Sequence, residues 1–180
     1  MEIINEVEEK MLSAIDHLAN DFNKVHTGRA NPSMLDGVEV SAYGSNVPLN
    51  QVAMISVPEA RQLLVKPFDP NTIKDLEKAI TEANLGFNPD NDGEMLRINI
   101  PQLTEEKRKS FVKDVKKYGE DAKIAIRNAR KDANNKVKKT DDLSNDEKKI
   151  AEDNIQELTT KYNKEIEEKV EQKEKEVMTV

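Results

Sequence analysis

The sequence predicts an α+β protein, an elongated antiparallel three-helix bundle with a small hinged β/α domain inserted between the first and second long helices. Three observations predict this class. Apolar residues recur every three or four positions near both ends of the chain, they alternate with polar residues in the middle, and Gly or Pro marks each change of pattern. The predicted domains are 1–30 with 104–180 for the bundle and 31–103 for the inserted domain.

The composition favours long solvated helices over an aromatic-rich enzyme core, because 4% of the 180 residues are aromatic, 35% are charged and the net charge is −7. There is no cysteine, so no disulfide framework is possible. The acidic N-terminus lacks the features of a secretory signal, and no run approaches the roughly 20 apolar residues of a membrane span. A cytoplasmic protein without a membrane partner is therefore expected.

The first predicted helix covers residues 3–27. Its apolar face consists of Ile4, Val7, Met11, Ala14, Ile15, Leu18, Phe22 and Val25. Gly28 is expected to end this helix, and Pro32 prevents its continuation. His17 and His26 are isolated from other metal-ligand residue types, so they are interpreted as surface residues and not as ligands.

Strands are predicted where the spacing of apolar residues changes to alternation. Residues 38–42 begin a hairpin, with a turn at Gly44-Ser45-Asn46, and residues 52–57 and 63–68 supply two further strands.

A short helix follows, and its apolar face is Ile73, Leu76, Ile80 and Ala83. It is expected to begin at Asp69-Pro70, where Asp caps the helix and Pro occupies its first position, and Gly86 can end it. Residues 88–93 are interpreted as a turn and 95–100 as the last strand.

The second long helix is expected to begin after the cap Thr104 and to run to Lys139. Its predicted buried stripe is Phe111, Val115, Tyr118, Ala122, Ala125, Ala129, Ala133 and Val137. Most basic residues fall on one side of this stripe, namely Lys109, Lys113, Lys116, Lys123, Arg127, Arg130, Lys131 and Lys138, and the acids Asp114, Asp121 and Asp132 fall on the other. We call the first side the basic face.

The third helix is expected to open with a capping box formed by Ser144 and Glu147. Its predicted apolar face is Ala151, Ile155, Leu158, Tyr162, Ile166, Val170 and Val177. The short connection at 140–144 forces the second and third helices to run antiparallel, and the three apolar faces then pack together. The chain passes between bundle and inserted domain at 28–32 and 101–104, and two such crossings with few contacts predict a hinge.

The charge distribution leaves two interpretations open. Residues 105–139 hold thirteen Lys or Arg and six acids, a net charge of +7, so the rest of the chain carries −14. A basic helix on an acidic body favours a directed contact with a polyanion such as nucleic acid. In the alternative, acids of the neighbouring helices neutralise a solvated face.

The spacing of Arg127, Arg130 and Asn134 favours the first interpretation, because these residues share the flank of the basic face nearest the core, where packing constrains them. Arg presents a planar fork to phosphate oxygens, and Asn can bond a phosphate, sugar or base edge. A catalytic constellation is not found, since the sequence has no phosphate-binding Gly-rich loop, no cysteine and no nucleophile elbow. Residues 88–93 weakly resemble a calcium loop but lack its terminal Glu.

Four segments resemble, in order and spacing, those of the bacterial ribosome recycling factor family: HTGRANPS at 26–33, NLGFNP at 84–89, LTEEKRK at 103–109 and RNARKDAN at 127–134. The resemblance implies a protein that is not an enzyme, needs no cofactor, acts as a monomer and has an outline like transfer RNA. It implies binding to the post-termination ribosome, chiefly to large-subunit rRNA, and separation of the subunits with elongation factor G and GTP. The alternative is a helical structural adaptor that binds a protein partner.

The resemblance also implies site residues. Arg127 and Arg130 match RNA-contacting arginines of the family, and Arg29 matches the arginine of its Thr-Gly-Arg segment. The candidate rRNA-binding residues are Arg29, Lys123, Arg127, Arg130, Lys131 and Asn134. The candidate hinge residues are Gly28, Ala30, Asn31, Pro101, Gln102, Leu103 and Thr104.

Overall fold

The structure, a computed structural model, describes residues 2–179 and confirms the α+β class. Contacts divide the chain into two compact units. The first contains the residues up to His26 together with Glu105–Thr179, and the second is Thr27–Thr104. Each unit has its own hydrophobic core.

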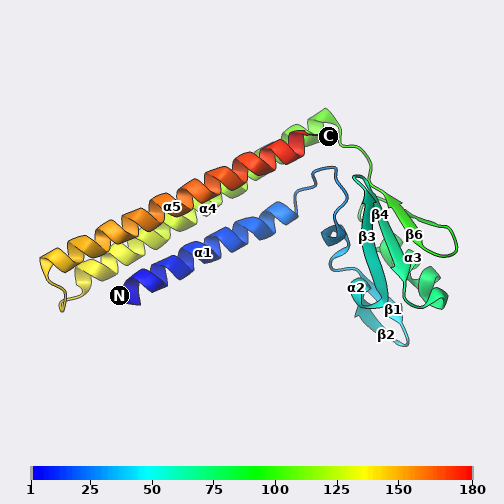
Figure 1. Cartoon of the computed structure of the whole chain (residues 1–180), viewed down its shortest axis with the longest axis horizontal. Coiled ribbons are helices and arrows are strands. Elements are labelled where there is room, and N and C mark those ends of the chain that lie inside the picture. The colour runs from blue at the N-terminus through cyan, green and yellow to red at the C-terminus, as the bar shows by residue number, and fades with distance from the viewer. Residues whose placement is uncertain (1, 180) are drawn as a thin grey trace. The chain divides into compact units, whose positions relative to one another are not determined.

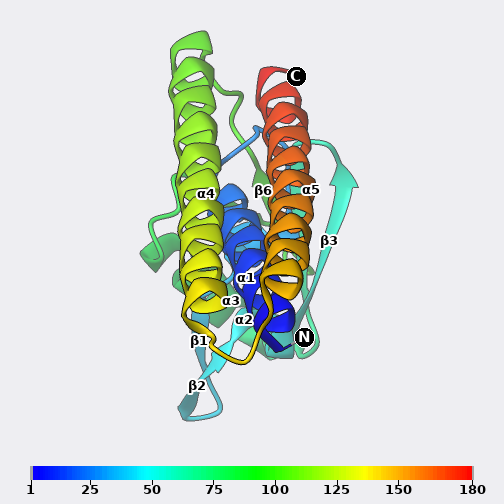
Figure 2. The same cartoon turned by 90° about the vertical axis from the view of Figure 1, so that its left-hand side faces the viewer.

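The first unit is a three-helix bundle of α1 (Glu2–Asn23), α4 (Glu105–Lys139) and α5 (Asn145–Met178). Figures 1 and 2 show the three helices side by side, with α4 and α5 antiparallel. Each helix contacts both others, and the predicted face of α1 is confirmed, since every residue of it except the half-buried Ile4 is buried. The Tyr162 hydroxyl of α5 donates a hydrogen bond of 2.9 Å to Glu8 of α1, and burial together with this carboxylate raises the pKa of Tyr162 to about 12.

Two expectations about these helices are wrong. Gly28 does not end α1, because the helix already ends at Asn23 and the N–H of Val25 bonds back to Phe22, which keeps Val25 in the core. On α4, Ala125 is exposed, whereas Gly119 and Ile126 are buried. A single apolar stripe is expected for a helix that packs against one neighbour. Because α4 packs against both α1 and α5, its buried surface is wider than the predicted stripe.

The buried Gly119 permits a close approach of α4 and α5. A Cβ atom at this position would lie 2.4 Å from Val170 Cγ2, closer than two carbon atoms can pack. Glycine inside a helix costs about 1 kcal/mol relative to alanine, so its presence here is explained by the helix contact and not by helix propensity.

We expect Gly119→Ala to lower the free energy of unfolding by about 1–2 kcal/mol, because the overpacking cost of roughly 1–3 kcal/mol exceeds the gain in helix propensity. The control is the same substitution in a Val170→Ala background, where the clash is gone and alanine should stabilise the helix by up to about 1 kcal/mol. Denaturant unfolding of the four proteins measures both values. Stabilisation by Gly119→Ala in both backgrounds would contradict the close approach.

The predicted capping box at the start of α5 is confirmed. The Ser144 hydroxyl accepts from the Glu147 N–H at 3.3 Å, and Glu147 Oε2 accepts from both the Ser144 N–H and its hydroxyl at 2.8 Å. These hydrogen bonds, the backbone one first, hold the pKa of the Glu147 carboxyl below its ordinary value.

A lowered carboxyl pKa contributes stability that is present above the unfolded-state pKa and is lost as pH falls through the folded-state pKa. We therefore expect Ser144→Ala to raise the pKa of Glu147 and to destabilise the bundle at neutral pH, with the difference narrowing in acid. NMR titration of the Glu147 carboxyl and urea unfolding across pH measure this. Ser144→Thr, which keeps a hydroxyl, is the control, and an unchanged Glu147 pKa in Ser144→Ala would refute the expectation.

The second unit combines a hairpin, a four-stranded antiparallel sheet and a helix. The hairpin is β1 (Glu39–Ala42) with β2 (Ser45–Pro48), and the sheet has the order β3-β4-β6-β5, with β3 Ala53–Glu59, β4 Gln62–Pro67, β5 Pro89–Asn91 and β6 Leu96–Asn99. The register pairs Val65 with both Ile55 and Leu96. Helix α3 (Ile73–Glu82) contacts β1 and β5, and its Ile73, Leu76 and Ile80 are buried as predicted, whereas Ala83 is exposed and lies beyond its end.

Sequence reasoning misplaced three short elements of this unit. The hairpin turn is Tyr43-Gly44, both with positive φ, so Ser45 and Asn46 belong to β2 and not to the turn. Residues Pro89–Asn91 form the edge strand β5, although 88–93 was expected to be a turn. The one-turn helix α2 (Leu49–Val52) was not predicted, and the 3₁₀ turns Pro32–Leu35 and Pro70–Thr72 precede regular elements.

Candidate nucleic-acid interface

The basic face of α4 borders α5, and acids of α5 neutralise part of it. Lys116 Nζ lies 4.0 Å from Glu174 Oε1, and Lys123 Nζ donates to Glu167 Oε1 at 3.0 Å. These pairs are consistent with the antiparallel arrangement, because a step of seven residues forward on α4 matches a step of seven backward on α5. The neutralisation expected in the alternative interpretation of the charge therefore occurs, but within residues 2–179 it is confined to these two lysines of the border.

Two arginines further along α4, one and two turns beyond Lys123, have no such partners. Arg127 and Arg130 are exposed, and neither side chain makes a hydrogen bond or an ion pair within residues 2–179. On α5 they face Thr159 and Asn163, which carry no charge. Two guanidinium groups therefore remain available to an external anion.

These side chains line a groove between the two helices, which we call the arginine groove. Its volume is about 140 Å³, and its lining residues are Lys123, Arg127, Arg130, Thr159, Asn163 and Glu167. Three cations against one carboxylate give the groove a positive charge. Arginine donors in a fork geometry at a groove wall are suited to phosphate oxygens.

The other predicted binding residues are distributed around the groove. Lys131 is exposed on α4, one turn beyond Arg127, and its ammonium makes no ion pair with any residue that the structure describes. Asn134 is half-buried, and its Oδ1 atom is buried without a hydrogen-bond partner. Arg29 is exposed but belongs to the second unit. The structure therefore gathers Lys123, Arg127 and Arg130 in one groove.

The groove residues of α5 were missed by sequence reasoning. Thr159 is 4% exposed, and its hydroxyl donates to the Ile155 carbonyl at 2.8 Å. Asn163 is half-buried, with an unpartnered buried Oδ1 atom. The available signal was their spacing, because two uncharged polar residues four positions apart interrupt a helix otherwise rich in Glu and Lys.

The opposite flank of α4 is occupied by contacts with α1. Lys136 hydrogen-bonds Glu6, which lowers the pKa of the Glu6 carboxyl, and Lys10 lies 4.0 Å from Asp132. Surface pairs of this kind add little stability, but they balance the charge along this border. The unpaired positive charge of the groove therefore lies on the α5 side of α4.

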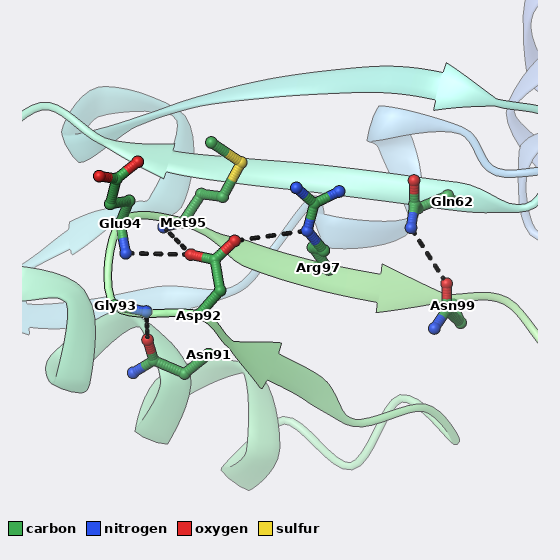
Figure 3. Close-up of polar contacts among 8 residues, drawn as sticks. All are labelled: Gln62, Asn91, Asp92, Gly93, Glu94, Met95, Arg97 and Asn99. Atoms are coloured by element: carbon green, nitrogen blue, oxygen red, sulfur yellow. Dashed lines mark hydrogen bonds and ion pairs between the residues drawn. The ribbon is translucent and has the colours of Figure 1, made fainter.

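Two side chains of residues 88–93, the segment that weakly resembles a calcium loop, use their oxygen atoms as acceptors within the turn: Asn91 Oδ1 accepts from the Gly93 N–H, and Asp92 accepts several hydrogen bonds (Figure 3). Asp92 Oδ1 accepts from the Glu94 N–H at 3.0 Å and the Met95 N–H at 2.9 Å, and Oδ2 accepts from Arg97 at 3.3 Å. These bonds, the Met95 one first, lower the pKa of the Asp92 carboxyl. The oxygens stabilise the β5–β6 turn.

Neither a metal site nor a membrane-spanning helix is found among residues 2–179. No group of three His, Cys, Asp or Glu side chains there is arranged to hold a metal ion. His17 Nε2 lies 3.4 Å from Asp21 Oδ2, an i, i+4 pair on α1. None of the helices described is long and apolar enough to cross a bilayer.

Comparisons with known proteins all identify the same family. The profile of the family described as "Ribosome recycling factor" matches residues 18–178. The ribosome-recycling factor of Clostridium novyi is 51% identical, with 99% of this chain and 98% of the relative covered. A solution structure of a ribosome recycling factor has a TM-score of 0.80 at 38% identity, and 99% of this chain and 97% of that one are covered. The Thermus thermophilus factor, in models with Escherichia coli elongation factor G bound to the post-termination complex, has a TM-score of 0.65 at 42% identity, with 98% and 97% covered.

Proposed function

The chain belongs to the ribosome recycling factor family, and on this premise we propose that it binds the post-termination ribosome and, with elongation factor G and GTP, separates it into subunits. The relatives support this function over nearly the full length of the chain. One of them, the Thermus factor, is bound with elongation factor G to a post-termination complex. As a translation factor without catalysis of its own, the protein acts in the cytoplasm, and the GTP is used by its partner.

The observation that carries the proposed RNA contact is the pair Arg127 and Arg130, exposed and unpaired beside uncharged residues of α5. Phosphate contacts fix the position of a protein on nucleic acid, and their strength depends on charge that is free to bind. Lys123 can contribute as well, because its pair with Glu167 is partly exposed and weak enough to exchange for a phosphate. The proposed rRNA-binding set also includes Arg29, Lys131 and Asn134.

The proposed movement concerns the two segments that join the units. We assign the hinge to residues of both segments, namely Gly28, Ala30, Asn31, Pro101, Gln102, Leu103 and Thr104. Gly28 has φ +79°, a conformation that residues with a Cβ rarely adopt. In hinges, a few loop residues absorb the change in backbone angles, and the conformational freedom of glycine suits it to this role. In this mechanism the bundle holds rRNA while elongation factor G displaces the second unit.

A subunit-splitting assay tests the function. Purified chain, elongation factor G from the same organism and GTP are mixed with post-termination ribosomes, and light scattering reports dissociation. We expect splitting that requires all three components, because the energy comes from the partner's GTP hydrolysis. Absence of splitting with all three present would reject the function. Binding of a protein partner without steep salt dependence would instead support the structural adaptor.

A further inference from the structure

Two arginines of the second unit are exposed and unpaired. Residues 27–104 hold six Lys or Arg and ten acids, a net charge of −4. Despite this excess of acids, the side chains of Arg29 and Arg61 make no hydrogen bond or ion pair in the part of the chain that the structure describes. The third arginine of the unit, Arg97, does contact an acid, with its Nε atom 3.3 Å from Asp92. Two guanidinium groups of an acidic unit therefore remain available to an external anion.

The turn between β3 and β4 brings these two arginines together. The Ala60 carbonyl of this turn accepts from the Ala30 N–H at 2.7 Å, and the Arg61 carbonyl accepts from the Ile100 N–H at 2.8 Å. The first of these bonds places Arg29 next to Arg61, because standard peptide geometry then allows no more than about 8 Å between their Cα atoms. Both side chains can therefore reach the same stretch of a ligand.

The backbone around the two arginines is fixed, which prepares them for binding. Arg61 lies in a tight turn between the paired strands β3 and β4. Ala30, which follows Arg29, packs against the core of the second unit, and Ile100 belongs to that core. Donors on a fixed backbone lose less entropy on binding a ligand than donors on a mobile loop. The pair is therefore better suited to hold an anion than two isolated arginines.

An RNA strand suits this pair better than a protein surface does. RNA presents a phosphate at every nucleotide, so two neighbouring arginines find two acceptors on the same strand. The planar fork of arginine matches the oxygens of each phosphate. Carboxylates on a protein surface are interspersed with cations, so a partner protein less readily offers two adjacent anions.

We propose that Arg29 and Arg61 form a second phosphate-binding site, on the second unit, which holds neighbouring phosphates of one ribosomal RNA strand. This inference rests on the proposed function, in which Arg29 is an rRNA contact, and it adds Arg61, which no sequence motif indicates. Each unit then has its own pair of unpaired arginines, since Arg127 and Arg130 belong to the first. The second unit thus contacts rRNA directly.

Arg61→Gln tests the site by equilibrium binding to purified large subunits. We expect affinity to fall about tenfold, the value of one charged hydrogen bond, and the slope of log affinity against log salt to fall by about one. Arg61→Lys should keep the slope and lose part of the affinity, because lysine keeps the charge without the fork. The melting temperature of both variants should not change, since the side chain has no partner among the described residues and the bond from Ile100 uses the backbone.

The matched control is Lys74→Gln, which removes an exposed cation of α3 that makes no ion pair within residues 2–179. It should leave affinity nearly unchanged, because Lys74 lies outside the paired site. Equal losses from Lys74→Gln and Arg61→Gln would mean that only the net charge of the unit matters, and would overturn the site. A loss in Arg61→Gln without a change in the salt slope would overturn it too, because no phosphate contact would have been removed.

Two further outcomes separate this inference from the proposed function. If Arg29→Gln weakens large-subunit binding and Arg61→Gln does not, the Arg29 contact stands alone and the paired site is wrong. If Arg61→Gln weakens only the affinity for elongation factor G, the arginine binds a carboxylate of the protein partner and the rRNA site is wrong. Subunit splitting by the unmodified chain keeps the proposed function in both cases, and its absence rejects that function.

Discussion

Replacing Arg127 and Arg130 together by glutamine lowers the affinity of the chain for the large ribosomal subunit by about a hundredfold and leaves its melting temperature unchanged. Each charged hydrogen bond to a phosphate is worth roughly 1.5–3 kcal/mol, so two such contacts account for at least this loss. Stability is retained because both side chains are exposed and have no partner among the described residues. Equilibrium binding to purified subunits and thermal unfolding measure the two quantities.

The control removes the same charge elsewhere on the helix. Lys117 and Lys139 are exposed on α4, lie outside the basic face and make no ion pair within residues 2–179. Changing both to glutamine should reduce affinity far less. The salt dependence separates the cases, because loss of two phosphate contacts reduces the slope of log affinity against log salt by about two. Equal losses from both double variants would mean that only net charge matters and that the groove is not specific.

The long helices could be predicted because burial repeats with helical spacing. The face of α1 and the capping box of α5 follow from local spacing and local hydrogen bonds, and both are confirmed. The buried surface of α4 could not be placed fully, because it depends on contact with two helices. Ile126 is buried and Ala125 exposed for this reason, and Gly119 is explained only by Val170 on the other helix. Strand β5 was missed because Pro, Asp and Asn resemble a turn until β6 pairs with them.

Which cations remain free could not be predicted from α4 alone. The basic face was identified by its spacing, but the pairing of Lys123 and the freedom of Arg127 depend on the register of α5 against α4. That register places Glu167 opposite Lys123 and Asn163 opposite Arg127. A helical periodicity contains no information about register between helices distant in sequence, so Asn163 is identified as a groove residue only in three dimensions.

Joining the two hinge segments by a disulfide should abolish subunit splitting while large-subunit binding persists. The positions are Gly28 and Leu103, because a Cβ atom at Gly28 would lie 3.5 Å from Leu103 Cγ, close to where a cysteine sulfur would sit. The chain has no cysteine of its own, so Gly28→Cys with Leu103→Cys gives a single defined cross-link. The cross-link fixes the two segments to each other and restricts backbone rotation at the residues assigned to the hinge. Splitting and binding are measured in the oxidised form.

The reduced form of the same double variant is the control, because it contains the same strain at Gly28, where φ is +79°. A loss of splitting activity caused by the side chain at position 28 appears in both the oxidised and the reduced form. A loss of splitting activity caused by the cross-link disappears on reduction. Persistent binding of the oxidised form is expected because Arg127 and Arg130 lie in the first unit and both cysteines in the second. Normal splitting by the oxidised protein would show that force passes through the chain without rotation at these segments, and the hinge would have to lie elsewhere.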